Sequence, residues 1–570
     1  MSKWFCLKKN SNDASASTST TSTMVSSSLV HDLDKLNLTE ERLKRYADEA
    51  NALSFNSTLI NKSESLLKFE AKFLREKAIS KTLNNIELSM KVDLCFVLDC
   101  SGSMKPHIAA AKDCILQVSN YIKHTNPNIK LRVGFCGYRD HTNGSNHLQI
   151  FDFNDQHDQF TQYMQDVLPI SNNDHPEDVL GGLDAAITKM DWQNNTRVLL
   201  HIGDYPPHGR RFSNLKDNYP DGDPNGLTAE NVLEKMQSKN ILYFFGKITN
   251  ETDKMIKIFR DIIGEFPVFD LVGGDPIKLI EKFIKATSSS ITHAVSLTST
   301  LGSNSKELLY SLQRKKLDMN PNEPDWNTLS LQKGVVMWYR IPNTLDKIKD
   351  PNYFTKSNLS SKSFNFKIAS QPFSAGVEKY AYFACDVKRL PTKEMVIKEY
   401  LHDGKQNNPF EKYLEAVEIS TVAYFLSEEF NYFARKKKIP KINFLKVKLL
   451  RNGTIDLCTR YYTVEPRLKD AEYKRFNANT GVITELRPTL EAFVHFTYEY
   501  TEGYLVVCDL QGIELNNEFL LTDPAIHCVD PLRFGRTNFG ENGIKQLFLA
   551  NHKCNDICKN LKLNHIGDIA

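Results

Sequence analysis

The sequence has no apolar stretch long enough to span a membrane. Its longest apolar runs, such as "ILYFF" and "YLVVC", have the length of a strand, whereas a transmembrane helix needs about 20 apolar residues. The N-terminus "MSKWFCLKKNSND" lacks the apolar core of a signal peptide, and Ser2 stands where N-myristoylation requires glycine. We therefore expect a cytoplasmic chain without a transmembrane segment, and peripheral association with the cytoskeleton or a membrane stays open.

The sequence also lacks a marked excess of either charge. Its 72 Lys and Arg against 69 Asp and Glu leave a net charge of +3 over 570 residues, and no long basic stripe is present. Nucleic-acid binding generally depends on clustered positive charge, so we predict no nucleic-acid partner. The 11 cysteines are an odd number, and most lie singly in apolar runs, as expected of reduced thiols in a cytosolic protein.

Changes in composition divide the chain into segments. Residues 1–37 include the stretch "SNDASASTSTTSTMVSSS", which is too polar to form a core and is predicted to be disordered. Residues 38–88 carry apolar and charged positions at helical spacing, which fits either a short coiled coil or helices packed on the next domain. The polar residues 291–334, with "DMNPNEPDW", predict a linker between two globular units.

Residues 89–290 alternate strand-like and helix-like segments. The apolar runs "VDLCFVL", "LRVGFCGY", "RVLLHIGD" and "NILYFFGKI" predict buried strands, and "KPHIAAAKDCILQVSNYIKH" predicts an amphipathic helix. Such alternation is typical of a parallel sheet with helices on both faces. We therefore predict an α/β doubly wound, Rossmann-like domain.

The motif "LDCSGSM" supplies oxygen ligands at the end of the first of these strands. Asp99, Ser101 and Ser103 lie on one loop, at the sheet edge where ligands bind in open α/β folds. A carboxylate and two hydroxyls suit Mg²⁺, although Ser103 at a helix start is also a typical capping residue. Asp204 ends a second strand. A third oxygen-rich loop carries Asp174, Glu177 and Asp178.

This region resembles the von Willebrand factor A domain with its metal-ion-dependent adhesion site. The resemblance implies that the three motif residues and Asp204 hold Mg²⁺, and that the carboxylate of a protein partner completes the metal shell. The threonine that the family places on the middle loop is missing, and Asp174 or Glu177 would substitute for it. An added anion at that position would weaken the attraction of an acidic partner.

Residues 335–565 predict a second, α+β unit that contains the run "YLVVCDLQG". Asp509 and Gln511 follow a buried strand, and residues i and i+2 of an extended chain point the same way. A carboxylate and an amide oxygen that point together suit Mg²⁺ and phosphate chemistry. Taken alone, the pair is also typical of a solvated strand end.

Other residues of this unit extend the same chemistry. Lys398 lies in the apolar strand "EMVIKEYL", where a lysine needs an anionic partner such as phosphate. Gly376 lies in a turn between strands, where backbone N–H groups can approach phosphates. Further polar positions are Glu465 in a strand that we interpret as a hinge, Asn477, Asn479, and Asp523 on a Pro turn.

The stretch "NHKCNDICKNL" has zinc-ligand spacing. His552, Cys554 and Cys558 supply three of the four ligands of a structural Zn²⁺ site, and His495 is the candidate for the fourth. The alternative is that the two cysteines are reduced core residues one helical turn apart.

This order of motifs resembles the alpha-kinase family of atypical protein kinases, which includes myosin heavy chain kinases and elongation factor 2 kinase. The resemblance rests on "HFTYEYT", "DLQG", "LTDP" and "HKCNDIC". It implies a two-lobed domain that uses ATP and Mg²⁺, with structural Zn²⁺, to phosphorylate Thr or Ser of a protein substrate, often in a helical or coiled-coil context. A von Willebrand A-like domain joined to such a kinase makes myosin II heavy chain one candidate substrate by analogy.

The resemblance also implies a role for each candidate residue. Lys398 would contact the ATP phosphates, Gly376 would lie in the phosphate loop, and Glu465 would lie in the adenine-binding hinge. Asp509 and Gln511 would hold Mg²⁺. Asp523 would be the catalytic aspartate, which orients the substrate hydroxyl or transiently takes the phosphoryl group. The zinc ligands would be His495, His552, Cys554 and Cys558.

Two loops depart from the family pattern. Lys379 stands where the phosphate loop usually has arginine, and Thr537 replaces a glycine in "RFGRTNFGENG". Neither change removes a metal ligand or Lys398, so we predict an active ATP-dependent Ser/Thr protein kinase, with a von Willebrand A-like domain that targets or regulates it through a protein partner. The alternative is a catalytically inactive, kinase-like adaptor that binds partners through its metal-site domain.

Overall fold

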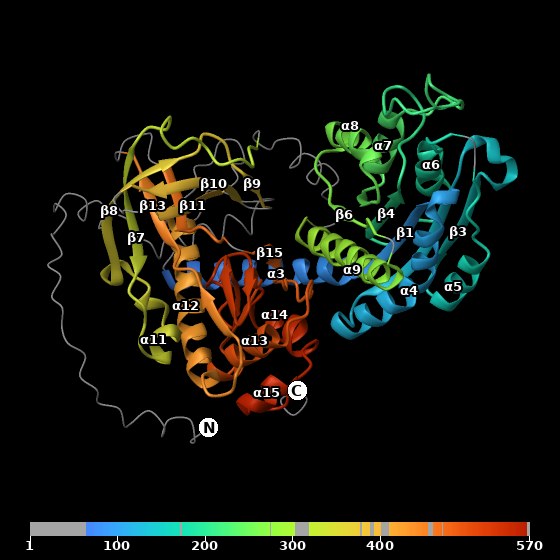
Figure 1. Cartoon of the computed structure of the whole chain (residues 1–570). Helices are drawn as coiled ribbons and strands as arrows, with labels where there is room; N and C mark the ends of the chain where they lie inside the picture. The colour runs from blue at the N-terminus through green and yellow to red at the C-terminus, as the bar shows by residue number, and fades with distance from the viewer. Residues whose placement is uncertain are drawn as a thin grey trace.

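The protein is organised as two units built on separate sheets, as the computed structural model in Figure 1 shows. The structure describes residues 64–171, 174–273, 275–301, 319–376, 379–387, 393–400, 410–453, 460–469 and 471–566. The predicted tail 1–37, and the part of the predicted helical segment before residue 64, lie outside the described residues. The rest of that segment is one helix, α3 (Glu64–Ser89), which leads directly into the first sheet.

The first unit contains a six-stranded sheet in the order β3-β2-β1-β4-β5-β6. All neighbouring strands run parallel except β3, which pairs antiparallel with β2. The strands are β1 (Lys91–Asp99), β2 (Lys130–Tyr138), β3 (Leu148–Asn154), β4 (Thr196–Gly203), β5 (Ile241–Lys247) and β6 (Val268–Asp270). The predicted parallel α/β sheet is therefore confirmed for this unit.

Helices cover both faces of this sheet. Phe96 of β1 belongs to a core shared with α4 (Lys105–Thr125), α5 (His157–Gln165) and α9 (Pro276–Leu301). Its neighbour Val97 points to the opposite face and packs in a core with α6 (Val179–Lys189), α7 (Ala229–Ser238) and α8 (Asp253–Ile263). Three short helical turns complete the unit: η3 (Gly102–Met104), η4 (His141–Asn146) and η5 (Asn250–Thr252).

The predicted start of the linker at residue 291 is wrong. Helix α9 continues to Leu301, and Ile291, Ala294 and Val295 are buried in the core of the first unit. Hydroxyl groups within this stretch bond back to the helix itself, because Ser290 Oγ donates to the carbonyl oxygen of Ala286. The Ser and Thr content that suggested a linker is therefore compatible with a buried helix.

The second unit begins with a strand-rich lobe. Its seven-stranded sheet has the order β11-β14-β13-β7-β8-β10-β9, and an additional β10–β11 pairing closes the sheet on itself. The strands are β7 (Gln332–Tyr339), β8 (Leu359–Ile368), β9 (Ser374–Ala375), β10 (Lys379–Asp386), β11 (Lys393–Tyr400), β13 (Lys448–Asn452) and β14 (Arg460–Pro466). Short helical segments between β7 and β8 are α11 (Leu345–Lys349), η6 (Pro351–Tyr353) and η7 (Lys356–Asn358).

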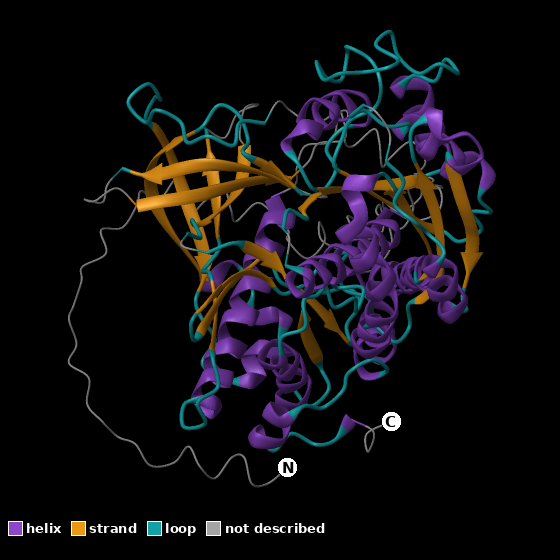
Figure 2. Cartoon of the chain, turned by 45° about the vertical axis from the view of Figure 1, so that its right-hand side comes forward, coloured by secondary structure: helices purple, strands orange, loops and turns teal. Residues whose placement is uncertain are grey.

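A second lobe carries most of the helices of this unit (Figure 2). The long helix α12 (Phe410–Ala434) and helix α13 (Pro488–Tyr500) share one core with two small sheets, β12-β18-β17-β15 and β16-β19. Their strands are β12 (Lys441–Phe444), β15 (Tyr473–Arg475), β16 (Leu505–Cys508), β17 (Gln511–Leu515), β18 (Glu518–Thr522) and β19 (Ala525–Cys528). The C-terminal part of this lobe contains α14 (Gly540–Gly543), the π-helix η8 (Ile544–Leu549) and α15 (Asp556–Leu561).

The two units touch through α3 and the end of α4. Asn126, at the end of α4, donates from Nδ2 to the carbonyl oxygen of Ile483 at 2.9 Å and accepts from its N–H at 2.7 Å. Ile79 of α3 shares a buried cluster with Val482 and Leu547 of the second unit. Because α4 begins near the carboxyl ends of the parallel strands and runs back along the sheet, this contact lies at the opposite edge.

Candidate functional site

A buried lysine and two carboxylates meet between the two lobes of the second unit. Lys398 lies on β11, whose register pairs Val396 with Glu465 on the neighbouring β14. Its Nζ is 2.5 Å from Glu465 Oε1 and 2.5 Å from Asp523 Oδ2. Lys379 Nζ, from the start of β10, is 3.1 Å from the other oxygen of Asp523. The sheet thus delivers two ammonium groups to one aspartate that lies between β18 and β19.

The electrostatics of this group favour a charged Lys398 and a charged Asp523. Burial lowers the pKa of Lys398, but Asp523 and Glu465 outweigh it and raise that pKa above its usual value. Burial raises the pKa of Asp523, but Lys379 and Lys398 reverse this and hold it well below its usual range. Burial raises the pKa of Glu465, whose second oxygen accepts a hydrogen bond from Thr522 Oγ1 at 2.7 Å. Asp523 is therefore a carboxylate, which accepts and does not donate a proton.

Asp509 and Gln511 flank a turn, so the extended backbone that we expected between them is wrong. Strand β16 ends at Cys508, and Asp509 has the left-handed φ of 56°. The turn still brings Gln511 to Asp523, because Gln511 Nε2 donates to the Asp523 carbonyl oxygen at 3.1 Å. Asn477 Oδ1 accepts from the N–H of Leu510 at 2.8 Å and so fixes the peptide between them.

Two further side chains complete this corner. Arg475 Nε donates to Asp509 Oδ1 at 2.7 Å, and the Tyr473 hydroxyl donates to Gln511 Oε1 at 3.2 Å. Both come from β15, which pairs antiparallel with β17. Our reading of the sequence missed them, although "YKR" shows the alternation that would place both side chains on one face of a strand.

Two other candidate residues, Gly376 and Asn479, make their described contacts with other parts of the unit. Gly376 follows β9, and its N–H donates to the carbonyl oxygen of Lys379 at 2.8 Å. A Cβ at Gly376 would meet that oxygen at 3.8 Å, so protein atoms alone do not require glycine there. Asn479 lies near the glycine-rich loop, since its Nδ2 donates to the Thr537 carbonyl oxygen at 3.4 Å.

The four predicted zinc ligands come together. One ligand atom from each of His495, His552, Cys554 and Cys558 lies within 4.8 Å of the others. Cys554 Sγ is 3.8 Å from His495 Nδ1, and Cys558 Sγ is 3.7 Å from His552 Nε2. Burial lowers the pKa of His495 to about 4 and that of His552 to about 3, so both imidazoles are neutral at pH 7. Neutral imidazoles are the form that binds metal.

The four ligands come from different elements. His495 is on helix α13, and Cys554 precedes α15, whose N-terminus is capped by Asn555. A site with these ligands would therefore connect a central helix to the C-terminal segment.

In the first unit, the "LDCSGSM" motif lies at the carboxyl edge of the sheet. Asp99 Oδ1 accepts from the Ser101 N–H at 2.8 Å, and the hydroxyls of Ser101 and Ser103 are 3.1 Å apart. Asp99 Oδ2 and Asp204 Oδ1 are buried and form no hydrogen bond. Burial and the charge of Asp204 raise the pKa of Asp99 well above its usual value. This donor set fits a hard divalent cation, which would compensate the two carboxylates.

Comparison with known proteins decides the family of the chain. The model of the alpha-kinase family matches residues 374–558. The alpha-protein kinase vwkA of Dictyostelium discoideum is 32% identical over 510 residues, which are 86% of this chain and 80% of the relative. The chain belongs to the alpha-kinase family.

Other alpha-kinases match a smaller part of the chain. Myosin heavy chain kinase B of Dictyostelium discoideum is 30% identical over 38% of this chain and 28% of its own length. Eukaryotic elongation factor 2 kinase of Rattus norvegicus is 30% identical over 35% of this chain and 26% of its own length. A solved alpha-kinase from Entamoeba histolytica is 29% identical and covers 43% of this chain and 94% of that structure, with a TM-score of 0.36.

Membership confirms the predicted enzyme class. This alpha-kinase is an ATP-dependent Ser/Thr protein kinase, and the inactive adaptor is not favoured. Within the part of the chain that the structure describes, no helix combines the length and the apolarity that crossing a bilayer requires.

Proposed function

We propose that this alpha-kinase transfers the γ-phosphoryl group of ATP to Thr or Ser with Lys398, Asp509, Gln511 and Asp523 as its working residues. The observation that carries the assignment is the contact of Lys398 and Lys379 with Asp523, next to the Gln511 amide. Phosphoryl transfer depends mainly on positioning and charge neutralisation, and this arrangement provides both.

Lys398 would bind ATP phosphates by exchanging one of its carboxylate partners for phosphate oxygens. Glu465 is held by Thr522, so it would keep the Lys398 ammonium in place during that exchange. This position favours a positioning role for Glu465, and its predicted contact with adenine stays part of the proposal. Gly376, in the turn before β10, would present its backbone to the phosphates.

Asp523 would act on the substrate hydroxyl or accept the phosphoryl group. While both lysines contact it, Asp523 is a weak base. When ATP draws Lys398 and Lys379 toward its phosphates, the carboxylate loses part of this stabilisation and becomes more basic and more nucleophilic. Binding of the first substrate would thus prepare Asp523 for the second.

Asp509 and Gln511 offer the hard oxygen donors that Mg²⁺ prefers. Bound Mg²⁺ supplies the positive charge that neutralises the ATP phosphates. In this structure Asp509 pairs with Arg475 and Gln511 with Tyr473, so both side chains would exchange partners to hold the ion.

The His495, His552, Cys554 and Cys558 cluster has the composition of a structural Zn²⁺ site. Closed sites with four N and S ligands are typical of structural zinc. The contact of α13 with the C-terminal segment would then depend on the ion, because His495 and the cysteines belong to different elements.

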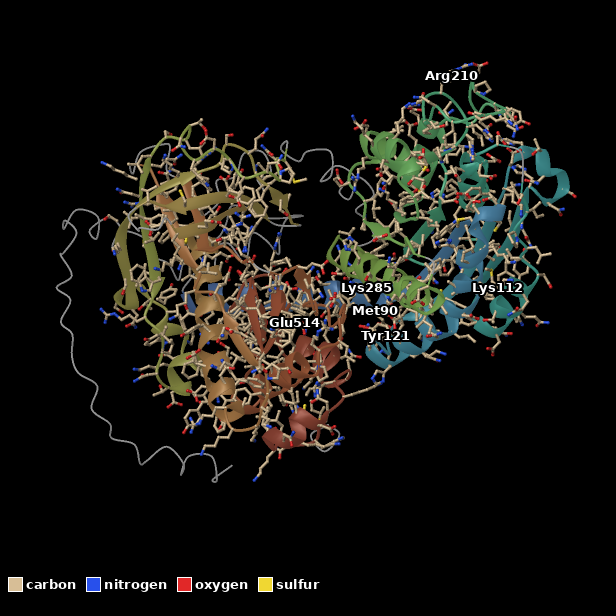
Figure 3. The ribbon with its side chains drawn as sticks, viewed as in Figure 1. Met90, Lys112, Tyr121, Arg210, Lys285 and Glu514 are labelled. Atoms are coloured by element: carbon tan, nitrogen blue, oxygen red, sulfur yellow. The ribbon has the colours of Figure 1, made fainter. Side chains whose placement is uncertain are left out.

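The first unit serves, in this proposal, as a von Willebrand A-like targeting or regulatory domain. Its support is the doubly wound sheet, together with the buried oxygens of Asp99 and Asp204 beside the two serine hydroxyls. Mg²⁺ at this position would give a protein partner's carboxylate a binding site. Arg210, on a loop at this edge, lies at the outer end of the unit in Figure 3, whereas Tyr121 and Met90 lie near the kinase unit. The edge therefore faces away from the kinase unit.

Helix α3, which leads into the first unit, also contacts the kinase unit directly, and through it the first unit would influence the kinase. Arg75 Nη2 donates to the carbonyl oxygens of Gly535, Arg536 and Asn538, at 3.2, 2.9 and 2.7 Å, in the glycine-rich loop. We expect Arg75→Ala to loosen this loop and lower stability by about 1–2 kcal/mol, because charged donors to buried carbonyls are lost. Hydrogen exchange of residues 535–543 would measure the loosening of the loop, with the exposed Lys72→Ala as control. Unchanged protection in Arg75→Ala would show that α3 does not stabilise this loop.

The substrate class follows from relatives and not from geometry. Relatives named myosin heavy chain kinases match 38% and 30% of this chain, so a helical segment of myosin II heavy chain is the substrate that we propose. Location at the cytoskeleton would follow from that choice.

The test is phosphate transfer from labelled ATP to a Thr-containing myosin tail fragment, by wild type and by Asp523→Ala. We expect transfer by wild type alone, with nucleotide binding retained in the variant. Transfer at wild-type rate by Asp523→Ala would remove Asp523 from the chemistry. Transfer by wild type to a generic peptide but not to the myosin fragment would reject the substrate and keep the site.

A further inference from the structure

A second group of ligand-type side chains lies at the carboxyl edge of the α/β sheet, outside the "LDCSGSM" motif. Asp140 follows β2, Asp174 precedes α6, and His208 follows β4. One carboxylate oxygen from each aspartate and one ring nitrogen of His208 lie within 4.8 Å of one another. All three residues are buried, with 0%, 8% and 2% of their surface exposed.

The three atoms that face one another form no hydrogen bond. They are Asp140 Oδ2, Asp174 Oδ1 and His208 Nε2. His208 Nε2 and Asp140 Oδ2 are 3.4 Å apart. Leaving three buried polar atoms without a hydrogen bond is costly, and the cost is higher when two of them are carboxylate oxygens.

The opposite side of each side chain is firmly held. Asp140 Oδ1 accepts from the Thr142 N–H at 2.5 Å, and Asp174 Oδ2 accepts from the Asn218 N–H at 2.9 Å. Each carboxylate therefore uses one oxygen to fix its orientation and directs the other into the group. This is the arrangement that metal-binding carboxylates adopt.

His208 is oriented in the same manner. Its Nδ1 is 2.7 Å from Asp217 Oδ1, and Asp217 also accepts backbone hydrogen bonds from Gly209 and Tyr219 at 2.7 Å each. Asp217 therefore faces Nδ1 as a hydrogen-bond acceptor, which assigns the proton of the neutral imidazole to Nδ1. The lone pair of Nε2 then points toward Asp140 and Asp174, as in the carboxylate–histidine–metal arrangement.

A neighbouring set, His141, His147 and Asp178, also has metal-ligand composition. There the histidines already have acidic partners: His147 Nε2 bonds Asp178, and His141 Nε2 is 3.1 Å from Asp223 Oδ2. These pairs satisfy one another without a cation. The unsatisfied atoms belong to the first set, which therefore has the stronger need for an ion.

We propose that Asp140, Asp174 and His208 bind a divalent transition-metal ion of the Zn²⁺ class, separate from the predicted Mg²⁺ position. A mixed set of one imidazole and two carboxylates selects such an ion over Mg²⁺, which prefers oxygen ligands alone. The ion joins the loops after β2, before α6 and after β4. Three protein ligands leave one position for water or for an acidic group of a partner.

The test is the zinc content of the whole chain after equilibration with Zn²⁺ in excess Mg²⁺. We expect His208→Asn and Asp140→Asn each to contain one ion fewer than wild type. His175→Gln is the matched control. His175 is exposed on the loop that carries Asp174, and its ring stacks on Tyr205. Since the comparison is a difference, it does not depend on whether the cysteine-containing cluster also holds zinc.

Retained phosphotransferase activity and circular dichroism would show that the variants are folded. Equal zinc in wild type and both variants would overturn the proposal and favour a proton shared between Asp140 and Asp174. Loss of zinc in His147→Gln but not in His208→Asn would also overturn it, by moving the ion to the neighbouring set. If the variants fail to fold, anomalous diffraction at the zinc edge from wild-type crystals decides, because the ion must lie among the three side chains.

Discussion

Buried carboxylates have opposite surroundings in the kinase site and at the carboxyl edge of the α/β sheet. In the kinase site, Lys398 contacts both Glu465 and Asp523, so the chain supplies its own cation. At the α/β edge, Asp99 and Asp204 each leave one buried oxygen without a hydrogen bond. The comparison teaches that the first site pairs its charges within the chain, whereas the second has buried carboxylate oxygens for which we propose a cation as the partner.

The largest effect should follow from removing the cation of the kinase site. Lys398→Met leaves Glu465 without its ammonium partner and leaves Asp523 with Lys379 alone. It also removes the group that we propose to bind the ATP phosphates. We expect phosphotransfer to fall on the order of 10²–10³-fold, as when one preorganised electrostatic group is lost. Steady-state kinetics and thermal melting would measure the two consequences.

The control for this variant is Lys393→Met, at the exposed start of the same strand. It should keep activity and stability. An equal loss of activity in both lysine variants would show that β11, and not the Lys398 charge, is what matters.

The next effect concerns the proposed zinc cluster, whose two imidazoles and two cysteine sulfurs would bind an ion together. Cys558→Ser should lose one zinc per chain and about 3 kcal/mol of stability, or roughly 6–12 °C in melting temperature for a domain of this size. Elemental analysis and calorimetry would measure it. Cys385→Ala, a buried cysteine of β10, should keep its zinc. A wild-type protein that binds no zinc at this cluster would contradict the assignment.

The smallest effect sharpens the comparison because its sign is reversed. In the presence of a chelator, Asp99→Asn should stabilise the first unit by about 1 kcal/mol, roughly 2–4 °C, since one buried negative charge beside Asp204 is removed. With Mg²⁺ present, the variant should lose this advantage and bind a partner less tightly. Asp113→Asn, on the exposed face of α4, is the control. Destabilisation of Asp99→Asn in chelator would show that the edge needs no external cation.

Local sequence motifs predicted the residues of the candidate sites better than they predicted the helices, strands and tertiary contacts around them. Lys398, Asp509, Gln511 and Asp523 are identified by short motifs, and the structure brings all four to one place. Arg475 was missed because its partner Asp509 is 34 residues away in sequence and becomes its neighbour through the β15–β17 pairing. Such contacts are set by tertiary pairing, which a local pattern does not contain.

The errors in secondary structure have a similar cause. The stretch "AFVHFTYEY" is rich in aromatic residues and favours a strand by propensity, yet it forms α13 because Phe493 and Phe496 pack on Phe430 of α12. The sequence around Asp509 alternates like a strand, but the chain turns there with a left-handed residue. Packing and turn geometry therefore override local preference at both places.

The most direct test of the central claim is phosphate transfer from ATP with Mg²⁺ by wild type and by Asp509→Ala. Asp509 is the residue at which the turn, the Arg475 pair and the proposed Mg²⁺ site coincide. The account predicts transfer by wild type, none by the variant, and an unchanged fold. Transfer by Asp509→Ala at the wild-type rate would contradict the account, because the site would then work without the carboxylate on which its metal binding is built.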